Sequence, residues 1–75
     1  MKYEVQIEIE NNFGKFKSRK SALSQENYDQ LINMSKKFYL SGFQLECEDD
    51  TFIIFPPEIV KNSILKIYAT KIENV

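Results

Sequence analysis

Apolar and polar residues alternate strictly near the start of the chain. In residues 3–10, YEVQIEIE, the tyrosine, the valine and both isoleucines hold odd positions, and glutamate or glutamine holds each even one. A period of two over eight residues is typical of a β-strand with one buried face. The stretch NNFG follows, and its asparagines and glycine tolerate the positive φ of a tight turn. A second strand is therefore expected over residues 15–23.

A four-residue loop at NNFG would set the register of this hairpin, because residues whose numbers sum to 25 then lie opposite each other. On the face formed by the even-numbered residues of the first strand, Glu10 pairs with Lys15, Glu8 with Lys17, and Gln6 with Arg19. Opposed unlike charges favour a register by roughly 0.2–1 kcal/mol per pair. On the opposite face, formed by the odd-numbered residues of the first strand, Ile9 pairs with Phe16 and Tyr3 with Ala22. This register also turns Ser18 and Lys20 inward, and inward-pointing charge is typical of an edge strand.

The period changes to a helical one in residues 24–41, SQENYDQLINMSKKFYLS. One stripe of this segment holds Tyr28, Leu31, Ile32, Ser35, Phe38 and Tyr39, as in an amphipathic helix. Ser24 is a favourable N-cap, and Gly42 supplies the left-handed residue that commonly ends a helix. One helix is expected here.

Strand patterns return after the helix. Apolar and polar residues alternate over residues 43–48, and Asp49-Asp50 suits a tight turn. Residues 51–55, TFIIF, would then form the returning strand of a hairpin. This register places Cys47 opposite Phe52 and leaves Ile53 and Phe55 on the outer face of the sheet.

The two prolines end that strand, because neither has an N–H to give to a neighbouring strand. Pro57 suits the first position of a short helical turn through residue 61. Residues 63–72, SILKIYATKI, alternate again and predict the last strand.

The elements occur in the order ββαβββ, which predicts a single small α+β domain over residues 1–75, with one helix packed on a mostly antiparallel sheet. Two arrangements fit this order. One is β-grasp-like, with the last strand parallel to the first, and the other is a roll with a simple meander after the helix.

Composition removes most catalytic chemistry from consideration. The chain has no histidine and one cysteine, Cys47, so an imidazole base, a disulfide within the chain and a four-ligand zinc site are all excluded. No glycine-rich nucleotide motif is present. We therefore expect a protein that is not an enzyme and that holds no cofactor.

The N-terminus is charged from its second residue, and the longest apolar run, residues 52–55, is far shorter than the roughly 20 residues of a membrane helix. These features predict a cytoplasmic protein without membrane contact. The formal net charge of −1 provides no overall attraction for nucleic acid.

Apolar side chains on the outer face of the sheet are the strongest functional signal. They are Ile53, Phe55, Ile64, Tyr68 and Ile72. A contiguous exposed apolar patch usually marks an association surface, and a domain this small gains stability from oligomerisation. A homodimer joined by this face is expected. A register shifted by one residue would instead turn each of these side chains to the other face.

The alternative function is nucleic-acid binding by the first hairpin. Its segment 13–20, FGKFKSRK, contains Phe13, Lys15, Lys17, Arg19 and Lys20. Aromatic residues interspersed with lysine and arginine are typical of proteins that bind single-stranded nucleic acid. The glutamates opposite Lys15 and Lys17 weigh against it, since they neutralise half of the patch.

Residues 16–46, FKSRKSALSQENYDQLINMSKKFYLSGFQLE, and 52–67, FIIFPPEIVKNSILKI, resemble small uncharacterised proteins of T4-like marine phages. The resemblance implies an accessory protein made in the bacterial host cytoplasm, with a host protein as a further target. It transfers no active site.

Overall fold

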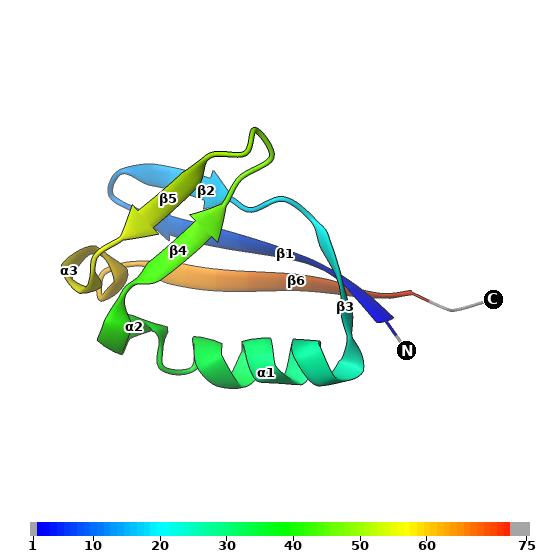
Figure 1. Ribbon diagram of the computed structural model, residues 1–75. Coiled ribbons are helices and arrows are strands. Elements are labelled where there is room, and N and C mark those ends of the chain that lie inside the picture. The colour runs from blue at the N-terminus through cyan, green and yellow to red at the C-terminus, as the bar shows by residue number, and fades with distance from the viewer. Residues whose placement is uncertain (1, 73–75) are drawn as a thin grey trace.

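The computed structural model describes residues 2–72, except for the side chain of Tyr39, so the place of that ring in the helical stripe lies outside the described residues. The strands are β1 (Lys2–Asn11), β2 (Gly14–Lys17), β3 (Ser21–Ser24), β4 (Phe43–Glu46), β5 (Phe52–Phe55) and β6 (Ile64–Ile72). The helices are α1 (Gln25–Ser35), α2 (Phe38–Ser41) and α3 (Pro57–Val60). Figure 1 shows their arrangement.

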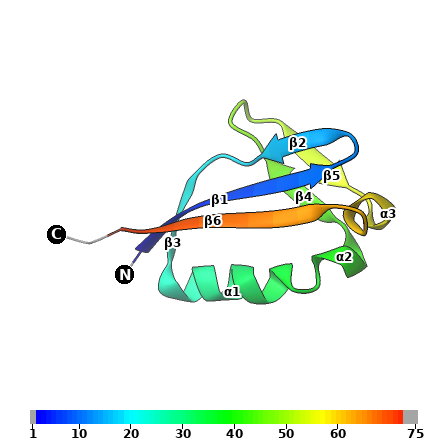
Figure 2. The same ribbon diagram turned by 180° about the vertical axis from the view of Figure 1, so that it is seen from behind.

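The fold is a small α+β fold with a mostly antiparallel sheet and one main helix, as the sequence predicts. Strand β1 lies in the middle of the main sheet, with β2 and β3 along one side and β6 along the other. Strands β4 and β5 form a separate hairpin. Figures 1 and 2 show this hairpin crossing one face of the main sheet, while α1 runs beside the sheet.

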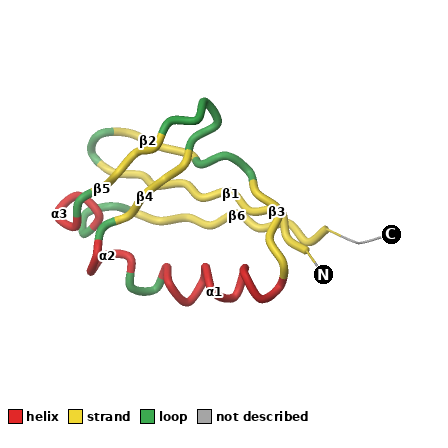
Figure 3. Tube along the Cα trace, viewed as in Figure 1, coloured by secondary structure: helices red, strands yellow, loops and turns green. Residues whose placement is uncertain are grey.

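Both arrangements proposed for the last strand are wrong. Strand β6 pairs with β1 along its whole length, but the pairing is antiparallel and not parallel as in a β-grasp fold. A meander is not formed either, because β6 leaves β5 and joins the main sheet (Figure 3). The short helix α3 makes this possible, since it separates β5 from β6 and reverses the chain.

The first hairpin follows the predicted register only as far as Lys17. Glu10, Glu8 and Ile9 lie opposite Lys15, Lys17 and Phe16, as predicted. In β3 the sum of paired residue numbers becomes 26. Tyr3 therefore lies opposite Leu23 and not Ala22, and the predicted pairing of Gln6 with Arg19 is wrong.

The cause is a β-bulge at residues 18–20, which adds one residue to the second strand. The backbone N–H of Ser18 donates to the carbonyl of Ile7, and the hydroxyl of Ser18 accepts from the N–H of Ile7. The extra residue turns Leu23 toward the helix. Lys20, which was expected to point inward, is exposed.

The register of the second hairpin also differs from the predicted one by one residue. Its loop runs from Cys47 to Thr51, closed by a bond from the Cys47 N–H to the Thr51 carbonyl, and Asp50 has a positive φ of 62°. Leu45 therefore lies opposite Ile53, and Phe43 lies opposite Phe55. Ile53 and Phe55 face the core, so their predicted place on the outer face is wrong.

The helical region begins and ends as predicted, but it is interrupted at residues 36–37 and is not one continuous helix. The hydroxyl of Ser24 caps α1 by accepting from the N–H of Asn27. Helix α1 stops at Ser35, and α2 follows as a separate turn. Gly42 ends α2 with a φ of 79°, where a Cβ would lie 2.7 Å from the carbonyl oxygen of Phe55. Glycine is therefore required at this contact.

The core lies between β1, the second hairpin and α3. Its buried members are Ile9, Leu45, Phe55 and Val60. No described residue of α1 is fully buried, and Leu31 and Ile32 are only half-buried. The main helix therefore covers its part of the sheet loosely.

Candidate interaction surface

Strand β6 carries the exposed apolar residues of the main sheet's outer face. Pairing with β1 places five β6 side chains on this face, namely Ile64, Lys66, Tyr68, Thr70 and Ile72. Ile64 is 58% exposed and Tyr68 is 51% exposed. Both lie where the sequence predicts. Ile72 lies on the same face opposite Lys2 and is half-buried.

A ladder of charges occupies the centre of the same face. Glu8 is only 4% exposed, although it points away from the core. Its carboxylate lies 3.9 Å from the Lys17 ammonium and 3.6 Å from the Lys66 ammonium, and the Tyr68 hydroxyl donates to it at 3.3 Å. Lys66 also lies 3.8 Å from Glu10. These partners satisfy the buried carboxylate, as a buried charge requires.

The far edge of β6 has no partner strand among the described residues, since β6 pairs only with β1. Nine residues of backbone are therefore open along one edge. Proteins commonly protect such an edge with a charged side chain, a bulge or a proline. Lys66 could serve this purpose, but Glu8 and Glu10 hold its ammonium group over β1 instead.

An open groove of about 500 Å³ lies between α1 and β6, on the inner side of the same edge. Its apolar walls include Ile32, Phe38, Leu65 and Ile67. Ser35 also lines it, and the Ser35 hydroxyl oxygen is buried without a hydrogen-bond partner among the described residues. The groove exists because α1 lies loosely against the sheet, and it adds apolar surface beside the open edge.

Sequence reasoning assigned the wrong residues of β5 to the surface. Phe55 is 6% exposed and lies in the core, and Ile53 packs against the core. Their neighbours Phe52 and Ile54 are exposed instead. The only available signal was the choice between two registers, since a shift of one residue exchanges the two faces.

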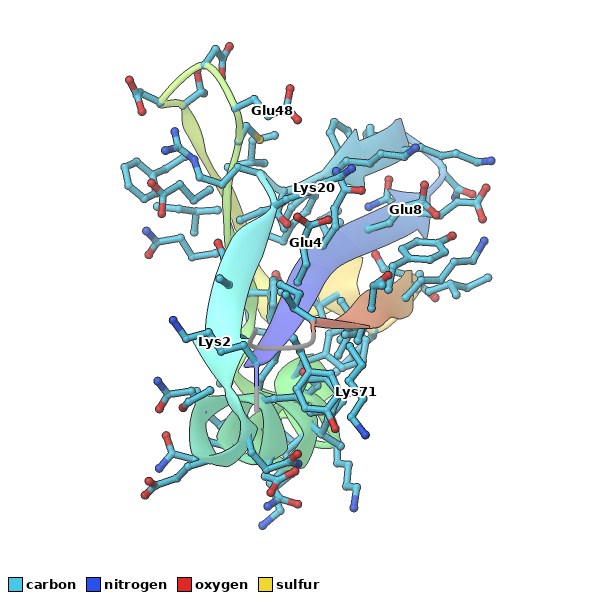
Figure 4. All side chains as sticks on the ribbon, turned by 90° about the vertical axis from the view of Figure 1, so that its right-hand side faces the viewer. Lys2, Glu4, Glu8, Lys20, Glu48 and Lys71 are labelled. Atoms are coloured by element: carbon cyan, nitrogen blue, oxygen red, sulfur yellow. The ribbon has the colours of Figure 1, made fainter. Side chains whose placement is uncertain are left out.

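The basic residues of the first hairpin do not form a continuous positive face. Lys15 lies 3.6 Å from Glu10, and Lys17 lies beside Glu8, as the register predicted. Phe13 is exposed at the turn. Lys20 lies near Glu4, and both line a shallow hollow beside β1 (Figure 4).

Arg19 turns toward the second hairpin. Its guanidinium donates to the Cys47 carbonyl at 3.0 Å and to the Asp50 carboxylate, and it lies 3.6 Å from Glu46. The hydrogen bond that Arg19 donates to Asp50, together with the charge of Glu46, raises the pKa of Arg19 above its ordinary value. Arg19 therefore fastens one hairpin to the other.

Comparison with protein families, curated proteins and solved structures finds no match to this chain. The resemblance to phage proteins stays a prediction. Within residues 2–72, no helix is long and apolar enough to cross a membrane, and no three potential metal ligands lie together.

Proposed function

We propose that this chain is a non-enzymatic protein-interaction module that associates with itself, with a homodimer as its working form. The observation that carries the proposal is the exposure of Ile64 and Tyr68 on β6, a strand with one open edge. Burying a large apolar side chain contributes about 1.5–3 kcal/mol. Ile64 and Tyr68 are already about half-buried, so each would contribute about half of that figure on each of the two copies.

The small core supports the same proposal. A domain of about this size buries only about 60% of the surface that its unfolded chain exposes. The loose packing of α1 leaves further apolar surface in contact with water. A second copy would remove part of this surface and would stabilise the fold through association.

The proposal includes an accessory role in the cytoplasm of a phage-infected bacterium, with a host protein as a second target. The resemblance noted above supports this role. Phe52 and Ile54 offer a second exposed apolar pair. They point away from the main sheet, so a foreign partner could bind there without displacing the second copy.

Light scattering on a size-exclusion column, over a wide concentration range, tests self-association. We expect wild type to have twice the chain mass of 8.9 kDa and Tyr68→Asp to be a folded monomer. Ile54→Asp is the matched control, because Ile54 is exposed on the second hairpin, and it should stay dimeric. A wild-type monomer at every concentration would refute the proposal.

Phe55→Asp is not a suitable variant for this test. Placing a carboxylate in the core at Phe55 removes apolar packing and buries an unpaired charge. We expect an unfolded protein, which circular dichroism would show.

A further inference from the structure

We propose that two copies join edge to edge through β6, in antiparallel pairing, with Tyr68 of one copy opposite Tyr68 of the other. The two main sheets would then form one continuous sheet. This inference rests on the proposed self-association and specifies its geometry. The open edge of β6 is nine residues long, or about 30 Å at about 3.4 Å per residue.

Symmetry restricts the register. A two-fold axis perpendicular to the sheet keeps the outer face of both copies on the same side, and opposed residues in antiparallel strands point to the same side. Paired residue numbers must therefore sum to an even number. A sum of 136 uses all nine residues of β6. It pairs Ile64 with Ile72, Leu65 with Lys71, Lys66 with Thr70, Ile67 with Ala69, and Tyr68 with itself.

The side chains of β6 are complementary to themselves in this register. On the outer face the two Tyr68 residues lie opposite each other at the axis, while each hydroxyl still donates to Glu8 of its own copy. Ile64 meets Ile72 of the second copy at each end. Lys66 lies opposite the uncharged Thr70, so no like charges oppose each other directly. Glu8 and Glu10 already hold the Lys66 ammonium over β1, away from the joining edge.

The groove between α1 and β6 supports the same partner. Leu65 and Ile67 line the groove at its β6 side, and Ile32 lines it from α1. Joining the two β6 edges brings the two grooves together across the axis, where each copy covers the other. Stable interfaces bury about 800 Å² per partner, so apolar contacts on both faces of the strand must accompany the backbone hydrogen bonds.

Cysteine cross-linking tests the register directly, in a Cys47→Ser background that removes the native thiol. Opposed residues in antiparallel strands have Cα atoms about 4.5–5.5 Å apart, within the range of a disulfide. Tyr68→Cys should form a covalent dimer under mild oxidation. Thr70→Cys should not, because its two copies would lie about 14 Å apart, four residues along the strand.

A charge substitution tests the same register without oxidation. Thr70→Lys would place a second lysine side chain opposite Lys66 of the other copy. Because Glu8 and Glu10 hold the Lys66 ammonium over β1, we expect a several-fold and not a larger rise in the dissociation constant. Ala22→Lys is the matched control, since Ala22 and Thr70 are both exposed and both lie opposite Glu4. It lies on β3 and should leave the dissociation constant unchanged.

The outcomes separate this inference from the proposed function. A Tyr68→Cys protein that stays dimeric under reducing conditions but does not cross-link, or a Thr70→Cys protein that cross-links instead, would overturn edge pairing and leave self-association standing. Equal effects of Thr70→Lys and Ala22→Lys would also overturn it. A wild-type monomer at every concentration would refute both.

Discussion

Along one side of β1 the chain places two four-residue strands, β2 and β3, separated by the bulge at residues 18–20. Along the other side it places one strand of nine residues, β6, that pairs without interruption. Both sides are edges of the same sheet. They differ in how much regular backbone each presents to a further strand.

The bulged edge is closed to strand addition for three physical reasons. Its strands are short, the bulge interrupts the hydrogen-bonding pattern, and the Arg19 N–H donates to the Glu46 carbonyl of the second hairpin at 3.0 Å. The described part of β6 has no bulge or proline, and Glu8 and Glu10 hold the ammonium group of Lys66 over β1. Of the two edges of the main sheet, as far as the described residues show them, the β6 edge is therefore the one suited to accept a second copy.

Removing the side chain that holds the bulge should have the largest effect on the protected edge. Ser18→Ala deletes the acceptor for the N–H of Ile7 and the donor to the Arg19 carbonyl. Because Ser18 is buried, we expect the free energy of unfolding to fall by about 1–3 kcal/mol. Urea denaturation of the variant and of the exposed control Ser21→Ala would measure it. Equal losses in both would contradict this role.

Releasing Lys66 should weaken the open edge as an interface. Glu8→Gln keeps an acceptor for the Tyr68 hydroxyl but removes the carboxylate that holds the Lys66 ammonium. We expect a several-fold rise in the dissociation constant and a loss of about 1 kcal/mol in unfolding free energy. Glu46→Gln, on the second hairpin, is the control for the dimer. A dissociation constant unaffected by Glu8→Gln would show that the position of Lys66 does not influence dimerisation through the β6 edge.

Loosening the contact between the two hairpins should have a smaller and local effect. Arg19→Ala removes the bonds to Cys47 and Asp50. We expect faster amide hydrogen exchange in the loop at residues 47–51, with the main sheet unchanged. Lys15→Ala, which removes an exposed ion pair, should leave this loop as in wild type. Faster exchange throughout the sheet would mean that Arg19 stabilises the whole fold.

The smallest effect concerns the pH response of that loop. The Thr51 hydroxyl and N–H donate to the Asp49 carboxylate and lower its pKa below the ordinary 3.8. The resulting stabilisation is present above pH 3.8 and is lost as the pH falls through the lower folded-state pKa. Thr51→Val should raise the pKa of Asp49 toward 3.8, as an NMR titration would show. An unchanged titration curve would contradict the role of the hydroxyl.

Much of the candidate surface could be predicted from the sequence. Alternation along β6 places Ile64 and Tyr68 on the outer face, and the positions opposite Lys15 and Lys17 predict the ion pairs with Glu10 and Glu8. The open groove could not be predicted, because it depends on how closely α1 approaches the sheet. The assignment of Ile53 and Phe55 failed because a loop one residue longer than expected exchanges the faces of β5.

The sequence by itself determined the elements of this protein: the alternating strands, the N-cap at Ser24, the proline turn of α3 and the charge pairs of the first hairpin. These depend on neighbours a few positions apart, or on a nearby hairpin partner. Only the tertiary structure decided the bulge, the loop at residues 47–51 and the antiparallel position of β6 beside β1. Each of these depends on which side chains fill the shared core, and a one-residue shift in a strand decides whether a side chain enters it.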